Sequence, residues 1–473
     1  MSGLYASLNN TVQALTAQSR AIEITGKNLA NVNNPNYARE SVVIGSRGTI
    51  PTPQGPESMG ISALALRQMR DALLDQQVMS QSSLTADYNA QQQAYQRAEA
   101  SLGQNVASSQ GTGGSSSTST GGIAASLDDL FNAFQSLAAN PTDPGQRQVL
   151  LQNATILTDR LQQASGKLTQ VSGDLDTQIG TDVTNANGLL QTIAGLNLQI
   201  FQLEINNPGS AVDLRDQRQA DLEQLAAKLP VASQTSATGQ FQIYAKDSLG
   251  NQVILVDGPN VRGTVAFTGT QITGGAPATP LALSAGSIQG ALSARDGGVK
   301  TLRDNLDQLA SQLVTSVNAA YNPTGITGDF FTAGGTTAGT IAVAAGVNAA
   351  SLKASDGGPA GDNTIALAVA QLATTKFSTG AGAAFNGTFG GFFSTAVSNI
   401  GQAAAGASTR VNDQSNIETL VRSQRDAVSG VSMDEETANL LKFQRAYQAS
   451  ARVFTTIDSL LASVINLGQA TTV

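Results

Sequence analysis

The two ends of this 473-residue chain carry the same kind of apolar repeat, although they are far apart in the sequence. Apolar side chains spaced seven residues apart lie on one face of a helix, as the a and d positions of a coiled coil do. A single helix with one apolar face is marginal in water until that face is buried. We therefore expect an assembly seam, formed by Leu8, Val12, Leu15, Ile22, Leu29, Leu440, Phe443, Tyr447, Phe454, Ile457 and Leu461.

Periodicity alone leaves two interpretations of this seam open. In the first, the two helices cap the core of an ordinary globular domain, which is the usual role of an amphipathic helix. In the second, they form a terminal coiled coil through which copies of the chain assemble. Both interpretations bury the same side chains, so the apolar positions do not distinguish them.

The composition excludes many kinds of active site. The chain has no Cys and no His, which excludes zinc sites built from thiolate or imidazole, Ser-His-Asp and Cys-His catalysis, and haem held by His. We also find no EF-hand spacing, no phosphate-binding loop and no nucleophile elbow. The sequence therefore predicts no enzyme, no catalytic or metal-binding residues and no cofactor.

The charge balance argues against two further partner classes. The net charge of −8 comes from 34 acidic and 26 scattered basic residues, whereas nucleic acid and anionic membranes are bound by basic surfaces. No apolar run approaches the roughly 18 to 20 residues of a spanning helix. The first 30 residues lack the charged start and continuous apolar core of a cleavable signal peptide. We expect no nucleic-acid or membrane partner, and any export must proceed without a cleavable signal.

The core must consist mainly of Leu, Ile, Val and Ala, because 41% of the residues are hydrophobic but only 4% are aromatic, with no Trp. This composition suits helical bundles.

The longest helical signal runs over 144–206. Its leucines lie seven residues apart, a series interrupted at Asp182, and Asp143 is the predicted N-terminal cap. Unbroken, it would span roughly 90 Å at 1.5 Å per residue, which predicts an elongated molecule. Other helices are predicted at 1–30, 63–102, 127–137, 213–228, 299–320, 363–373, 409–428 and in the C-terminal seam.

Non-helical segments separate these helices. The Asn-rich run 28–37 predicts a turn that ends the first helix, and 41–61 is predicted to be a loop or short hairpin. The Gly/Ser tract 108–122 is typical of a flexible loop. Alternating residues over 231–292 predict a small β-rich domain, and the Gly/Ala/Thr-rich stretch 324–400 suggests a second, mixed insertion.

The predicted fold class is mainly α with β-rich insertions. It is elongated and multidomain, with a terminal-helix coiled coil, a long helical bundle and outer β and mixed domains. The predicted domains are a terminal coiled-coil core of 1–37 and 434–473, a helical bundle of 38–229, 296–325 and 401–433, a β-rich outer domain of 230–295, and a mixed outer domain of 326–400.

The turn after the first helix carries a recognisable motif, with matching residues Asn28, Asn31, Asn33, Pro35 and Tyr37. It resembles the Asn-x-x-Asn-x-Asn-x-Pro-Gly-Tyr pattern at the end of the N-terminal helix in axial proteins of the bacterial flagellum. Arg39 fits the basic position that follows in that family. The family's Gly is Asn36 here, and Asn tolerates the left-handed region better than other non-Gly residues. Without the resemblance, the run is simply a helix stop and a turn.

Interior blocks narrow the resemblance to the hook-associated protein 1 family, the first hook-filament junction proteins. The blocks are NPTDPGQRQVLLQNA at 140–154, AVDLRDQRQADLEQLA at 211–226, SIQGALSARD at 287–296, and the stretch from 429 to 467. Within the last block, Asp434, Glu435 and Glu436 are interpreted as the first turn of a helix, where carboxylates suit the positive dipole end.

The resemblance implies a structural component of the bacterial flagellum, a junction or adaptor between hook and filament on which the filament assembles and which motility requires. The implied partners are further copies in a ring or tube, hook protein, the next hook-filament junction protein, and a flagellar export chaperone at the C-terminal helix. The implied location is extracellular, at the hook-filament junction, after type III export. The coiled coil would line the export channel, the bundle would form the wall, and the insertions would face outward.

Three alternatives remain at this stage. Another axial protein such as hook protein shares the termini but would not be expected to carry the helical blocks of 140–226. A secreted adhesin or effector would use the β domains to bind host surfaces. An enzyme would require a pocket with strongly perturbed carboxylates.

Overall fold

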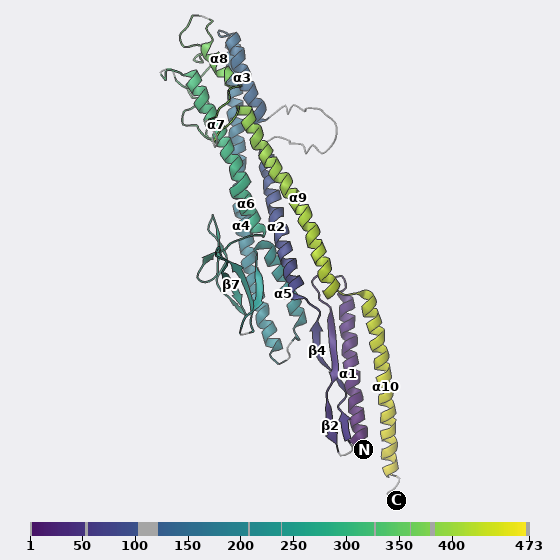
Figure 1. The fold of residues 1–473 in the computed structure, drawn as a ribbon. Coiled ribbons are helices and arrows are strands. Elements are labelled where there is room, and N and C mark those ends of the chain that lie inside the picture. Colours follow the sequence, from purple (N-terminus) through teal and green to yellow (C-terminus); the bar gives the residue numbers. More distant parts are fainter. Residues whose placement is uncertain are drawn as a thin grey trace. The chain divides into compact units, whose positions relative to one another are not determined.

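The computed structural model describes residues 2–52, 55–102, 122–206, 209–237, 239–325, 328–359, 361–378 and 384–469. Helices dominate these residues, and small antiparallel sheets interrupt them (Figure 1). The predicted fold class, mainly α with β-rich insertions, is confirmed. The helices are α1 Ser2–Ala30, α2 Ala72–Ser101, α3 Ile123–Ala139, α4 Pro144–Glu204, α5 Val212–Lys228, α6 Ser287–Ala294, the π-helical η1 Arg295–Val299, α7 Lys300–Tyr321, α8 Thr364–Gln371, α9 Phe389–Ser429 and α10 Met433–Gln469.

The strands fall into two stretches of the chain. The first stretch, between α1 and α2, holds β1 Glu40–Ser46, β2 Thr49–Thr52, β3 Gly55–Ser58 and β4 Ile61–Gln68. The second, between α5 and α6, holds β5 Ala232–Thr235, β6 Phe241–Lys246, β7 Gln252–Asp257, β8 Asn260–Val261, β9 Ala266–Phe267, β10 Ile272–Gly274 and β11 Thr279–Pro280.

The chain divides into two compact units, each made of several chain segments. The first unit comprises Met1–Ser83, Asn185–Leu283 and Ser415–Val473. The second unit comprises Leu84–Thr184 and Ser284–Gln414. The division falls inside α2, α4 and α9. The four domains predicted from the sequence stay a prediction.

In the first unit, β1 pairs with β4 in an antiparallel ribbon, and β2 pairs with β3 in the hairpin between them. The second strand stretch forms a four-stranded sheet in the order β5-β6-β7-β8 and a three-stranded sheet in the order β11-β10-β9. Two buried or half-buried amides of α4 fix these strands, because backbone groups there need partners. The side chain of Asn187 exchanges two hydrogen bonds with the backbone of Val265, and Asn197 donates to the carbonyl of Gly258.

In the second unit, α3, α7 and α8 surround an aromatic core that contains Phe134, Tyr321 and Phe330. The leucine ladder of α4 is buried here at Leu161, Leu168 and Leu175. Asp182, which interrupts the ladder, is itself 1% exposed, and its carboxylate accepts a hydrogen bond from the Ser287 hydroxyl at 2.6 Å. A buried carboxylate that is hydrogen-bonded in this way can replace an apolar residue in a core.

The structure corrects two helix predictions. The helix expected from residue 63 begins at Ala72, because residues 61–68 pair with β1 as strand β4 instead. The helix expected from residue 409 begins at Phe389, twenty residues earlier. Its first half contains Gly390, Gly391 and several alanines, which weaken an apolar pattern without preventing a helix. The predicted loop at 108–122 lies, except for its last residue, outside the described residues.

Candidate assembly site

The two terminal helices lie side by side in the first unit and run in opposite directions, so that both chain ends lie at the same end of the pair (Figure 1). The β1–β4 ribbon also contacts α1. The sequence predicted that the two ends meet, and in one protomer they do. Whether copies assemble through the same helices is a separate question, which depends on the face that each helix leaves open.

On α10 the predicted seam is the most protected stripe of the helix. Leu440, Phe443, Phe454 and Ile457 are half-buried, and Leu461 is 6% exposed. Tyr447 is the exception, at 41% exposed. Other apolar side chains of the same helix also stay exposed, at Leu441, Val453, Leu460, Val464 and Ile465.

On α1 the predicted seam is not the buried face. Leu8, Leu15, Ile22 and Leu29 are half-buried, and Val12 is 44% exposed. The buried residues are instead Thr11, Ala17, Ala21, Ile24, Thr25 and Asn28.

At 3.6 residues per turn, the two stripes of α1 are centred roughly 120° apart on the helix. Side chains as small as alanine allow neighbouring elements to approach the helix closely. This face is therefore buried, although its alanines contribute little to an apolar sequence pattern. The heptad face of α1 therefore remains partly open in a single protomer.

The motif turn is built around Asn28, which is 1% exposed at the end of α1. Its Nδ2 donates to the carbonyl oxygen of Glu40 at 2.8 Å and to the Glu436 carboxylate at 3.0 Å. Its Oδ1 accepts from the Tyr37 hydroxyl at 2.7 Å and from the backbone N–H of Glu40 at 3.0 Å. The amide thus uses both donors and both acceptor positions. Asn28 joins α1, β1 and α10 at one point.

Arg39 fastens the residues after the turn to α9 and α10. Its Nε donates to Glu436 at 2.8 Å, its Nη1 donates to Glu435 at 2.7 Å, and its backbone N–H donates to the carbonyl of Ser429 at 2.8 Å. Glu435 and Glu436 do lie in the first turn of α10, as predicted. The interpretation that they serve only the helix dipole is incomplete, because Glu436 is 2% exposed and directly bonded to Arg39 and Asn28.

The other motif residues shape the turn locally. Asn31 donates to the carbonyl of Lys27 at 3.0 Å, and the carbonyl of Pro35 accepts from Arg425 at 3.2 Å. Asn33 is exposed, and its side chain makes no hydrogen bond with the described residues. No described non-Gly residue has a positive φ, so Asn36 does not use the left-handed conformation that its replacement of Gly suggested.

A partly buried ion-pair group lies beside the turn. Lys27 bonds Glu40 at 2.7 Å and Asp213 of α5 at 2.6 Å. Burial raises the pKa of Glu40, and Lys27 only partly opposes this shift. Burial alone would lower the pKa of Lys27, but the two carboxylates outweigh it and raise that pKa. Burial, followed by the charge of Glu40, also raises the pKa of Tyr37.

Two further clusters attach α5 to its neighbours. Arg70 bonds Asp75 at 3.0 Å and Asp216 at 2.7 Å, and Asp216 also accepts the backbone N–H of Ala38 at 3.2 Å. Burial raises the pKa of both carboxyl groups, Asp75 and Asp216, although Arg70 opposes this shift.

Glu223, one heptad after Asp216, bonds two arginines of α9: Arg422 at 3.0 Å and Arg425 at 2.8 Å. Removing one member of such a buried pair leaves an uncompensated charge.

Sequence reasoning named Asn28, Tyr37 and Arg39 but missed Glu40, which bonds Asn28, and the surrounding charged residues Asp213, Asp216, Glu223 and Arg425. One signal was available: Asp216 and Glu223 lie seven apart on the same face of a helix that is otherwise expected to bury that face. Charged residues at positions where an apolar stripe is due indicate a buried network.

The chain was compared with known proteins. Residues 114–331 match the family model described as the flagellar hook-associated protein FlgK helical domain, and residues 422–467 match the flagellar basal body rod FlgEFG protein C-terminal model. Flagellar hook-associated protein 1 of Bacillus subtilis is 26% identical over 98% of this chain and 99% of its own length. The Escherichia coli protein of the same name is 22% identical over 97% and 99%.

A solved structure agrees in fold. The flagellar hook junction protein FlgK from Burkholderia pseudomallei superposes with a TM-score of 0.62 over 75% of this chain and all of that chain, at 15% identity. Paired terminal helices, the Asn-rich turn and the rod-type C-terminal match define the class as the axial proteins of the bacterial flagellum. Within that class, the nearly full-length relatives and the helical-domain match place the chain in the flagellar hook-associated protein 1 family.

Proposed function

We propose that this chain is a structural subunit of the bacterial flagellum that forms the junction between hook and filament, on which the filament assembles and which motility requires. The observation that carries this proposal is the combination at the terminal helices. Their relative position is fixed within the protomer by Asn28, Arg39 and Glu436, while the heptad face of α1 and several apolar side chains of α10 stay partly open. A subunit with a preset helix pair and open apolar faces is suited to repeated, heterologous contacts.

The partners follow from the same proposal. Copies of the chain would form a ring or tube, with hook protein on one side and the next hook-filament junction protein on the other. An export chaperone would cover the exposed apolar side chains of α10 until assembly, since exposed apolar surface promotes non-specific association. The chain would act outside the cell, after type III export. Among the described residues, no helix is long and apolar enough to span a bilayer.

The proposed role is mechanical, and the relatives of this family are structural proteins. A bending hook and a stiff filament require different lateral contacts, and an intermediate layer can match each. We propose that the assembly seam makes contacts between copies, in addition to contacts inside one protomer. Its residues are Leu8, Val12, Leu15, Ile22 and Leu29 on α1, and Leu440, Phe443, Tyr447, Phe454, Ile457 and Leu461 on α10.

The first test is deletion of the gene, followed by electron microscopy of the cells and measurement of flagellin in the medium. Bare hooks with flagellin released as monomer are expected, because export would continue while the platform is missing. Normal filaments on the deletion strain would overturn the proposal.

A pair of point variants separates assembly from folding. Val12→Asp places a charge on the 44% exposed seam position of α1 and is expected to leave the protomer folded but to abolish filaments. Leu249→Asp places the same charge at an 85% exposed residue in the turn between β6 and β7, and is expected to leave filaments normal. Filaments in both strains would remove the seam from the proposal.

A further inference from the structure

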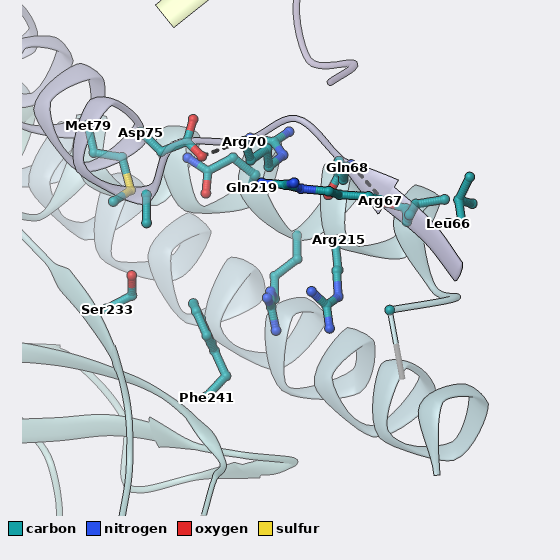
Figure 2. Close-up of a pocket in the computed structure, with 14 residues that line it drawn as sticks. Leu66, Arg67, Gln68, Arg70, Asp75, Met79, Arg215, Gln219, Ser233 and Phe241 are labelled. Atoms are coloured by element: carbon teal, nitrogen blue, oxygen red, sulfur yellow. Dashed lines mark hydrogen bonds and ion pairs between the residues drawn. The ribbon is translucent and has the colours of Figure 1, made fainter. Parts of the chain in front are cut away.

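A cavity of about 420 Å³ lies within the first unit, next to the motif turn, since its lining residue Arg70 donates to the Asn36 carbonyl at 3.0 Å. The end of β4, the start of α2, α5 and the start of β6 line it. Figure 2 shows Arg70, Asp75, Gln68 and Gln219 together along one side, with Arg215 and Phe241 across from them. Four of the lining residues are arginines: Arg67, Arg70, Arg215 and Arg218.

The four arginines are not all neutralised. Arg70 is paired with Asp75 and Asp216, and Arg215 is paired with Glu204. Arg67 and Arg218 have no carboxylate partner within the part of the chain that the structure describes. Four guanidinium groups therefore face three carboxylates, which leaves an excess of one positive charge around the cavity.

Arg218 is held rigidly although it lacks an acidic partner. It donates to the side-chain oxygen of Asn197 at 2.9 Å, and its guanidinium lies 3.8 Å from the ring centroid of Phe241. Burial, and then the like charge of Arg215, lowers the pKa of Arg218 to about 10, which still leaves it protonated at neutral pH. The Nε of Arg215 is buried and has no hydrogen-bond partner among the residues that the structure describes. A guanidinium fixed in place with donors to spare is prepared for an oxyanion.

We propose that this cavity binds a small carboxylate anion, which accepts hydrogen bonds from Arg218 and Arg215 and places its carbon chain against the apolar part of the lining. The excess of one charge matches a monocarboxylate better than inorganic phosphate, which carries about −1.5 to −2 at neutral pH. The apolar lining at Leu66 and Met79 favours a ligand with a hydrocarbon portion over a bare inorganic ion. The proposal does not depend on the junction role.

The carboxylate can come from either of two sources. It can be a free organic acid, or it can be the acidic side chain of a second copy of this chain. Both use the same guanidinium chemistry, and they differ in whether occupancy changes self-association.

The test is calorimetric titration of the full chain with sodium butyrate, at an ionic strength held constant with sodium chloride, and with inorganic phosphate as the second probe. Saturable binding at one site per chain is expected for butyrate, with weaker binding of phosphate. Arg218→Gln is expected to weaken butyrate binding at least tenfold, which is about 1.4 kcal/mol. Arg67→Gln, an exposed lining residue without a partner to lose, is expected to weaken it several-fold.

Arg20→Gln on α1 is the matched control, because Arg20 is exposed and, within the described part of the chain, its acidic contact is Glu23 alone. Its affinity for butyrate is expected to equal that of the unmodified chain. Heats that do not saturate, or that fall equally in Arg20→Gln and in the cavity variants, would overturn the proposal. If Arg218→Gln fails to fold, as circular dichroism would show, Arg67→Gln still decides the outcome.

Sedimentation at increasing protein concentration separates the two sources. If a second copy supplies the carboxylate, butyrate and Arg67→Gln both weaken self-association. If a free acid is the ligand, neither changes it while the calorimetric binding remains. If butyrate neither binds in calorimetry nor changes self-association, the cavity has no carboxylate ligand and the inference is refuted.

Discussion

Replacing Asn28 with alanine is expected to open the junction between α1, β1 and α10. The change deletes four hydrogen bonds, one of them to the Glu436 carboxylate, and strands buried groups of Tyr37, Glu40 and Glu436. A neutral hydrogen bond contributes about 1 kcal/mol and one to a charged group about 1.5–3. The simple sum is about 5 kcal/mol. Because water will enter the gap and solvate some of the stranded groups, we expect a loss of roughly 3 to 5 kcal/mol.

The suitable assay is amide hydrogen exchange on peptides that cover 28–46 and 430–440, because a chain with more than one compact unit does not give a single free energy of unfolding. Local opening free energies are read from exchange directly. A tenfold change in exchange rate corresponds to about 1.4 kcal/mol. The expected loss of stability therefore corresponds to exchange that is faster by a factor of about 10² to 10³ or more.

Asn33→Ala is the matched control for Asn28→Ala. It changes the same residue type in the same turn, at an exposed position with no side-chain hydrogen bond to the described residues. Its effect is expected to stay within about 0.5 kcal/mol. If Asn28→Ala and Asn33→Ala accelerate exchange equally, the hydrogen-bond accounting is refuted.

Three other perturbations give sharp expectations. Asp75→Asn addresses pH: burial raises the folded-state pKa of Asp75 above its ordinary 3.8, so its contribution to stability is complete below that value and is lost as pH rises through the raised folded pKa. The variant should therefore show a flatter decline of the thermal midpoint than the unmodified chain as pH rises above about 4, and identical slopes would contradict this reasoning. Gly290→Ala in α6 would push a methyl group into the backbone carbonyl of Asp87, which should cost about 1–3 kcal/mol of local stability, read from amide exchange in α6. Gly297→Ala in η1, where nothing lies within 4 Å, should be neutral or stabilising, and equal losses in the two variants would exclude the clash. Glu223→Gln should speed exchange in α5 and α9 by at least tenfold, because Arg422 and Arg425 both lose their shared charge, and unchanged exchange would show that water replaces the carboxylate.

The elements that the sequence predicted well are those in which local and tertiary preferences agree. The α4 helix has its leucine ladder, and its predicted cap is present, since the Asp143 carboxylate accepts the backbone N–H of Gly145 at 2.8 Å. The β4 strand was misread because Leu66, Met69 and Leu73 happen to have helical spacing. Pairing with β1 decides the conformation there, and that pairing is a tertiary fact.

The candidate site was only half accessible from the sequence. The motif identified Asn28 and Arg39, but their partner Glu436 is about 400 residues away, and its acidic neighbours supplied a sufficient local explanation. On α1, alanines carry little weight in an apolar repeat, so the heptad leucines drew attention from the face of Ala17 and Ala21 that is buried. Two of the cavity arginines lie at or just after the end of β4, and the other two lie in α5. No local sequence pattern connects these two parts of the chain.

The hydrogen bonds of Asn28 fix the axial register of α1 against α10. A heptad repeat is degenerate, because sliding one helix past the other by seven residues, about 10 Å, sets equivalent apolar positions against each other again. The Asn28–Glu436 bond removes that freedom, because any slide buries a carboxylate and an amide with no partner. Every copy of the chain therefore holds its two terminal helices in the same register.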